Sequence, residues 1–293
     1  MSTPSAMSLR LGCRGAFVRQ PVSRGSSATT HLSEIQRMSG IWQALAREAA
    51  LAAEHLVIGA SAIDKADHGR EGTYSQMLFA LSIGFERSAK LAVVVDHALV
   101  HDGAYPEFRV LRSYGHNIKE LLEEADAIAA RRNLPMDQRL PRSDIHPAII
   151  DVLDDFASNV TRYYNLDVVT GDPRTSGRID PSRAWFERVT LPVIRRHRPS
   201  DWQELHKEVA LDQNARTLRD AFTVAWTVNR SKPFVRLYVL QIARFLGFLL
   251  GGLGHAGYHV HTASIPHLSE FFAIINNPDV YLRKRKTWSI YNP

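Results

Sequence analysis

Apolar residues recur at intervals of three and four along much of this 293-residue chain, and this periodicity constrains the fold most. Over residues 39–67 the recurring positions are Ile41, Leu45, Ala49, Ala52, Leu56 and Ile63. Such spacing places apolar side chains on one face of an α-helix. No stretch shows the every-second-residue alternation that is typical of strands, so the sequence predicts an all-α fold.

The remaining segments extend the same pattern. Residues 74–99 are apolar on most faces, as expected for the central helix of a bundle. Further helices are predicted over residues 118–132 and 146–164, around Trp185, over 202–228 and 234–253, and after Pro266. Together these elements predict an antiparallel helical bundle with additional C-terminal helices.

A segment rich in Gly, Pro and Asp, residues 170–181, marks the expected internal boundary. We therefore predict a disordered tail over residues 1–35, a helical bundle over 36–180, and a C-terminal helical extension over 181–293 that packs on the bundle. The tail is Arg-rich, Ser-rich and free of acids over its first thirty residues, which fits a disordered or mis-started N-terminus or an organelle transit peptide.

The net charge of +6 is concentrated in two short segments. Four arginines lie in the tail, and residues 283–286 form the run Arg-Lys-Arg-Lys, so the rest of the chain is close to neutral. Tyr281, Trp288 and Tyr291 flank the terminal run, a composition that suits nucleic-acid contact. A solvated helix end is the structural alternative.

Two features of the sequence bear on where in the cell the protein is located. Cys13 is the only cysteine, so no intrachain disulfide can form, which favours a reducing cytoplasm. Residues 235–260 are the most apolar stretch, but Arg236, Gln241 and Arg244 interrupt it and five glycines follow. Because a spanning helix needs about 20 mostly apolar residues, this stretch predicts a buried core helix and no membrane association.

Neither a metal nor an organic cofactor is predicted. His255 and His259 are one helical turn apart, but no acidic residue accompanies them in a metal-binding pattern. The glycines at 251, 252 and 254 do not follow a predicted strand, so they do not form a dinucleotide-binding loop. Close helix packing or a helix stop accounts for them more simply.

Three short motifs occur in a recognisable order. They are the helical segment 84–90, which contains Glu86 and Lys90, the helix entry 114–118 around His116, and the segment 162–167, which runs from Arg162 to Asp167. In this order, residues 72–180 resemble the HEPN superfamily, the helical bundles of prokaryotic RNase toxins, defence proteins and nucleotidyltransferase partners. The resemblance implies a helical bundle and a connection with RNA or nucleotides.

In the RNase members of that superfamily, an Arg followed by a His after four to six intervening residues acts from one helix. Three pairs in this chain have that spacing: Arg24/His31, Arg109/His116 and Arg139/His146. The first lies in the tail, and Gly115 and Pro141 interrupt the other two. Arg162 leads only to Asp167, Val168 and Val169, so the standard RNase signature is missing and enzymatic activity is left open.

The motif residues could nevertheless bind a ligand or transfer a proton. Glu86 and Lys90 have the favourable order for an ion pair on one helical face. His116 at a helix start could contact phosphate or transfer a proton, and Arg162 beside two tyrosines suits phosphate binding and base stacking. The predicted ligand-binding residues are Glu86, Lys90, His116, Arg162, Tyr163, Tyr164 and Asn165, and a purely structural polar network is the alternative for them.

Three functions follow from these observations. The first is a HEPN-like helical protein that binds RNA, a nucleotide or a protein partner in stress response or phage defence. The second is a metal-independent RNase with His116, Arg162 and Asp167 as the catalytic candidates. The third is a structural or interaction module that forms a homodimer through helix faces.

Overall fold

The computed structural model describes residues 26–66, 71–158, 161–211, 218–259, 264–285 and 288. Residues 1–25, most of the predicted disordered tail, lie outside the described residues. The chain divides into two units, residues 1–38 and residues 39–293. In the first unit the described residues are helical from Ser26. The hydrophobic core belongs to the second unit.

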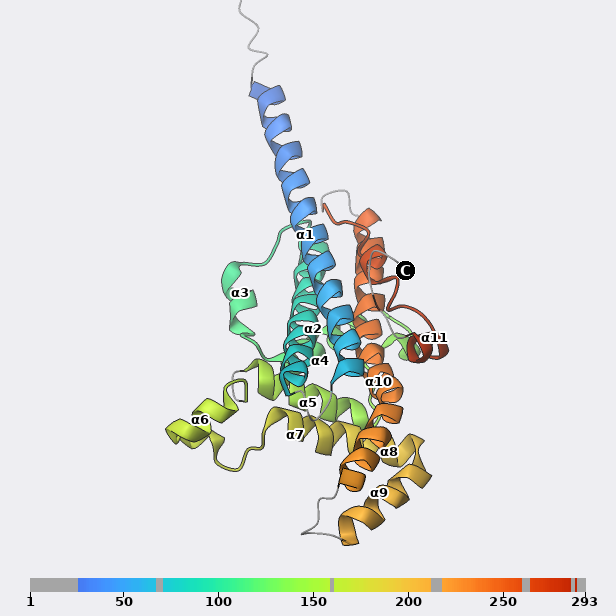
Figure 1. The fold of residues 1–293 in the computed structure, drawn as a ribbon. Coiled ribbons are helices and arrows are strands. Elements are labelled where there is room, and N and C mark those ends of the chain that lie inside the picture. Colours follow the sequence, from blue (N-terminus) through green and yellow to red (C-terminus); the bar gives the residue numbers. More distant parts are fainter. Residues whose placement is uncertain are drawn as a thin grey trace, which may run out of the picture. The chain divides into compact units, whose positions relative to one another are not determined.

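Every regular element in the described residues is a helix, and no strand occurs among them, which confirms the all-α prediction (Figure 1). The longer helices are α1 (Ser26–Lys65), α2 (Glu71–Val100), α4 (Ile118–Arg131), α5 (Ile145–Ala157), α9 (Pro199–Leu211) and α10 (Leu218–His259). The shorter ones are α3 (Phe108–Ser113), α6 (Tyr164–Thr170), α7 (Pro181–Trp185), α8 (Leu191–His197) and α11 (Asp279–Lys284). Four short segments, η1 (Met136–Gln138), η2 (Pro173–Thr175), η3 (Phe186–Thr190) and η4 (Leu268–Phe272), join them.

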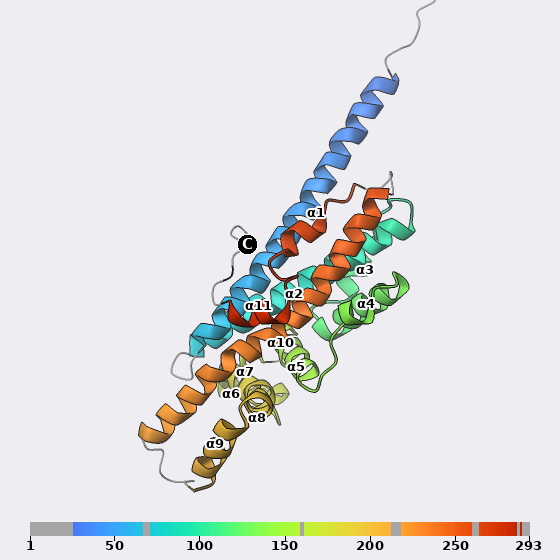
Figure 2. The same ribbon diagram turned by 90° about the vertical axis from the view of Figure 1, so that its right-hand side faces the viewer.

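Helices α2 and α10 are central to the packing. Helix α2 contacts α4, α5 and α10, and α10 also contacts α8, α11 and η4. Figures 1 and 2 both show α2 and α10 close to each other within this group of helices. Phe85 of α2 and Leu246 of α10 are completely or almost completely buried. These contacts bear out the predicted helical bundle.

Two glycines allow α1 and α2 to approach closely. A Cβ atom at Gly59 would lie 2.5 Å from the Leu81 side chain, and one at Gly84 would lie 2.8 Å from the Leu56 side chain. Along α1 the contact moves from residue 56 to 59 while along α2 it moves from 84 to 81, so the two helices run antiparallel. The two helices can approach this closely because neither position carries a Cβ atom.

A second close approach joins α10 to the segment before η4. A Cβ at Gly254 would lie 3.0 Å from the backbone nitrogen of Leu268, and one at Gly257 would lie 2.8 Å from Ile265. The helix continues through these glycines to His259. Close helix packing, one of the two readings of this glycine-rich stretch, is therefore confirmed.

Helix α10 is longer than predicted, because the expected break between residues 228 and 234 does not occur. Pro233 lies inside the helix, although it has no backbone N–H and an interior proline costs about 3 kcal/mol. Ser231 and Val235 on either side are buried, so packing compensates for the lost hydrogen bond. Residues 224–258 have the length and composition of a membrane span, but 67% of their most apolar window is buried within the protein, as in a core helix.

Other helix boundaries also differ from the prediction. Helix α5 ends at Ala157, not at residue 164, and the Ser158 hydroxyl donates to the Asp154 carbonyl at 2.8 Å. Arg162 consequently lies between α5 and α6. Pro192 lies within a continuous helical run formed by α7, η3 and α8, directly after the π-helical turn η3. Helix α3 lies in a stretch where the sequence pattern predicts no helix, and it buries none of its residues.

Candidate functional site

Three of the predicted site residues form one cluster. Glu86 and Lys90 are one turn apart on α2, and the Lys90 ammonium donates to Glu86 Oε1 at 2.8 Å. His116, in the turn before α4, donates from Nδ1 to Glu86 Oε2 at 3.0 Å. Lys90 also donates to the backbone carbonyl of Gly115 at 2.6 Å, which fixes this turn against α2.

The local backbone explains why His116 reaches Glu86. Gly115 has a positive φ of 53°, a conformation that glycine adopts without strain. The Asn117 side chain then accepts the backbone N–H of Glu120 at 3.0 Å and caps α4. The turn and the cap together place the imidazole over the Glu86–Lys90 face of α2.

The cluster is only partly enclosed. The His116 side chain is 59% exposed, whereas Glu86 is largely covered. Burial alone would raise the pKa of Glu86, but hydrogen bonds from Lys90 and His116 outweigh it and hold the pKa below its ordinary value. Glu86 is therefore an ionised carboxylate at neutral pH, and it orients the side chains of Lys90 and His116.

Arg162 does not join this cluster through any contact that we observe. Its guanidinium lies over the rings of Phe79 and Phe156, 4.8 Å and 5.5 Å from their centroids, and Nη2 donates to the Ala157 carbonyl at 3.4 Å. Phe79 and Glu86 are two turns apart on α2, about 10 Å along the helix axis. The predicted site residues therefore form two separate groups, one around Glu86 of α2 and one around Phe79 of α2.

The residues that follow Arg162 form the start of α6, which is an exposed helix. Tyr163 precedes α6 and is exposed, and the Tyr164 hydroxyl donates to the Arg178 carbonyl at 3.2 Å. Asn165 is exposed, and Asp167 lies in the first turn of α6. Helix α6 buries none of its residues, so these side chains are presented at a surface.

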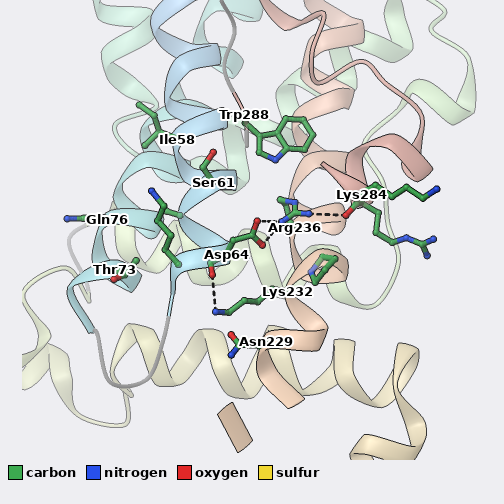
Figure 3. A pocket seen from close by; sticks show the side chains of 14 residues that line it. Ile58, Ser61, Asp64, Thr73, Gln76, Asn229, Lys232, Arg236, Lys284 and Trp288 are labelled. Atoms are coloured by element: carbon green, nitrogen blue, oxygen red, sulfur yellow. Dashed lines mark hydrogen bonds and ion pairs between the residues drawn. The ribbon is translucent and has the colours of Figure 1, made fainter. Parts of the chain in front are cut away.

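A large hollow in the described part of the chain lies away from these residues. It has a volume of about 970 Å³ and is lined by residues of α1, α2, α10 and α11, together with Trp288. Arg236 is at its centre (Figure 3), so we call it the Arg236 pocket. Its charged lining residues are Lys65, Lys232, Arg236, Arg283, Lys284 and Asp64.

Arg236 is held from two sides at the base of this pocket. Its side chain is 1% exposed, and Nη1 donates to both carboxylate oxygens of Asp64 on α1. Nη2 donates to the backbone carbonyl of Arg283 on α11 at 2.9 Å. Lys232, one turn earlier on α10, donates to the Asp64 carbonyl at 3.1 Å. Figure 3 shows these groups converging from α1, α10 and α11.

Two buried donors at the pocket have no acceptor among the described residues. They are Nε of Arg236 and Nε1 of Trp288, whose indole is only 8% exposed. In Figure 3 the indole nitrogen is on the side of the ring that faces Arg236. A buried donor without an acceptor costs about 1–3 kcal/mol, so an acceptor bound here would recover that free energy.

The electrostatics of the pocket favour an anion. Five basic residues line it against one acidic residue, and the acid is already bonded to Arg236. Burial lowers the pKa of Arg236, and the Asp64 carboxylate opposes that shift. Lys65, Arg283 and Lys284 are exposed at the rim, where their charges can reach a ligand. The arrangement can therefore bind a group with several negatively charged oxygens.

Parts of this pocket are visible in the sequence, but their assembly is not. Arg236 stands out because it interrupts an apolar stretch, and an arginine buried in a core helix is costly without a carboxylate partner. The terminal basic run was recognised, and its residues Arg283 and Lys284 lie at the pocket. Lys286 and Tyr291 lie outside the described residues. Asp64 carried no signal in the sequence.

Comparisons with models of protein families, with curated proteins and with solved structures find no match to this chain. The structure shows an all-helical protein, and the likeness of its motifs to the HEPN superfamily stays a resemblance. Among the described residues, no group of three or more His, Cys, Asp or Glu side chains is placed to hold a metal ion.

Proposed function

We propose that this protein binds a phosphate-bearing ligand, a nucleotide or RNA, in the Arg236 pocket. The two buried donors without acceptors, on Arg236 and Trp288, carry the proposal. Phosphate oxygens are strong acceptors, and a guanidinium already fixed by Asp64 loses little further conformational freedom on binding them. The basic rim adds attraction at longer range.

The resemblance of residues 72–180 to the HEPN superfamily agrees with this chemistry. We propose a cytoplasmic, HEPN-like binding protein without the standard RNase signature, acting in stress response or phage defence. Because the Arg236 pocket uses residues of α10 and α11, its ligand would contact the C-terminal part of the chain as well as α1 and α2.

A second candidate function, a metal-independent RNase, rests on the contact between Glu86 and His116. A carboxylate that orients an imidazole is a common arrangement for proton transfer. Arg162 contacts Phe79 and Phe156 instead of His116, so in such an enzyme Glu86, and not Arg162, would be the residue that orients His116. Degradation of total RNA by the wild-type chain but not by His116→Ala would support this function.

The binding proposal is tested by direct titration of the full chain. Labelled single-stranded RNA and a labelled nucleotide are each titrated at low and at moderate salt. We expect binding that weakens with salt, because charge neutralisation drives it. If neither probe binds in a salt-sensitive manner, the proposal is wrong.

A matched pair of double variants localises the binding. Arg283→Gln with Lys284→Gln removes two rim charges and should weaken binding at least about tenfold, roughly 1.4 kcal/mol. Arg109→Gln with Arg195→Gln removes the same charge from exposed positions on α3 and α8, outside the pocket lining. Equal loss in both double variants would show that only net charge matters.

A further inference from the structure

The Arg236 pocket has two chemically different sides. On the α11 side lie the basic side chains of Arg283 and Lys284. On the α1 and α2 side the neutral polar residues Ser61, Thr73 and Gln76 (Figure 3) accompany the charged residues Asp64 and Lys65. A simple anion needs only the first side, whereas a ligand with a charged end and a polar neutral end would use both.

The floor of the pocket adds a backbone acceptor. Pro233 has no N–H, so the carbonyl of Asn229, one turn earlier on α10, lacks its helical hydrogen-bond donor. Asn229 and Pro233 both line the pocket, and the exposed Asn229 amide can donate as well as accept. Donors and acceptors side by side match the edge of a nucleobase, which itself presents both.

The volume of the pocket suits a small molecule better than a bare ion. About 970 Å³ is at the upper end of the range of roughly 300–1,000 Å³ for pockets that hold small ligands and cofactors. A phosphate ion would leave most of this space empty. The Trp288 indole is only 8% exposed, so it offers little of the stacking surface that RNA-binding proteins present to successive bases.

From these observations we infer that the ligand is a free nucleoside polyphosphate. This inference rests on the proposed function and narrows it. The phosphate chain lies against Arg236, Lys232 and the basic residues of α11, and the nucleoside lies toward Asn229 and the neutral polar residues of α1 and α2. Five basic residues suit a chain of several phosphates better than a single one.

A competition experiment with the full chain tests the inference. A fluorescent nucleoside triphosphate is bound first and then displaced by unlabelled nucleoside triphosphates, by inorganic tripolyphosphate or by a short single-stranded RNA. We expect at least one nucleoside triphosphate to compete at a concentration about tenfold lower than tripolyphosphate, since the nucleoside adds contacts worth about 1.4 kcal/mol. Equal competition by tripolyphosphate would overturn the nucleoside assignment.

The outcomes separate the inference from the proposed function. If RNA binds directly in a salt-sensitive manner and the nucleotide does not, the inference fails while phosphate binding stands. If neither binds, both fail. Stronger competition by the short RNA than by every nucleoside triphosphate would also overturn the inference.

A pair of amide variants tests the contact with Asn229. Asn229→Ala should reduce the preference for nucleoside triphosphate over tripolyphosphate severalfold while leaving tripolyphosphate affinity unchanged. Gln203→Ala removes a neutral amide from an exposed position on α9, outside the pocket lining, and should leave both affinities unchanged. Both amide side chains belong to exposed residues, and thermal melting of each variant checks that the fold persists. Loss of nucleotide affinity in Gln203→Ala alone would overturn the inference.

Discussion

Arg236 of α10 donates to both carboxylate oxygens of Asp64 of α1, across 172 positions of the sequence. The guanidinium is almost fully buried while the carboxylate is partly exposed, so the pair links the interior of α10 to the surface of α1. Because the same guanidinium holds an unpaired Nε at the pocket, this ion pair both ties two helices together and orients a binding group.

Removing the carboxylate should destabilise the fold strongly. Asp64→Ala leaves Arg236 buried without its counter-ion, which typically costs 3–5 kcal/mol, so we expect a loss of about 3 kcal/mol in the free energy of unfolding. Urea denaturation measures it. The control is Glu48→Ala, which breaks an exposed pair with Arg87 and should cost under about 1 kcal/mol. Similar losses in both variants would show that the Asp64–Arg236 pair has no special role.

The glycine contacts between α1 and α2 predict a sharp positional difference. Gly84→Ala places a Cβ 2.9 Å from the backbone nitrogen of Leu56, which cannot rotate away, so we expect a loss of about 1–3 kcal/mol. Gly40→Ala, in the same pair of helices, meets no atom within 4 Å and should be neutral or stabilising by up to about 1 kcal/mol. Thermal or urea unfolding compares them, and a neutral Gly84→Ala would contradict the close approach.

The stability of the protein should fall on mild acidification because of His146. Its Nδ1 accepts the Ser143 backbone N–H at 3.1 Å and its Nε2 donates to Gln241 at 2.9 Å, an arrangement that requires a neutral ring. Burial lowers the pKa of His146 in the folded protein below the unfolded value of about 6.5. The unfolded state therefore takes up the proton first, so this contribution is complete above about pH 6.5 and is lost as the pH falls toward the folded pKa.

The measurement is the free energy of unfolding at about pH 7.5 and about pH 5.5 for the wild type and His146→Gln. His55 and His197 also have a pKa lowered first by burial, so some pH dependence should survive in the variant. The wild type should lose more stability on acidification than His146→Gln does. An identical loss in both proteins would show that His146 does not titrate in this way.

The Glu86 cluster predicts unequal effects of its members. Glu86→Ala leaves the half-buried Lys90 without its carboxylate and should cost about 1–2 kcal/mol. His116→Ala should cost less than about 1 kcal/mol, because most of its side chain is exposed. Urea denaturation of both variants checks the order, and a larger loss for His116→Ala would show that the imidazole carries more of the stability than its exposure indicates.

The sequence predicted local features well and long-range assembly poorly. The all-α fold and the Glu86–Lys90 pair follow from spacing within a single helix, and these were confirmed. The end of α5 was misjudged because its apolar stripe continues to Val160, so Arg162 was expected on a helix. The Arg236 pocket needs residues from both ends of the chain, and no local pattern encodes which distant carboxylate meets Arg236.

The binding role of the Arg236 pocket is tested most directly by photo-crosslinking. An azido nucleoside triphosphate is irradiated with the full chain, and the labelled peptides are mapped. The account predicts attachment within residues 58–65 or 229–236 or beside Trp288, suppressed by excess unlabelled nucleotide and by Arg283→Gln with Lys284→Gln. Attachment around Glu86 and His116, or labelling that neither competitor nor variant suppresses, would contradict it.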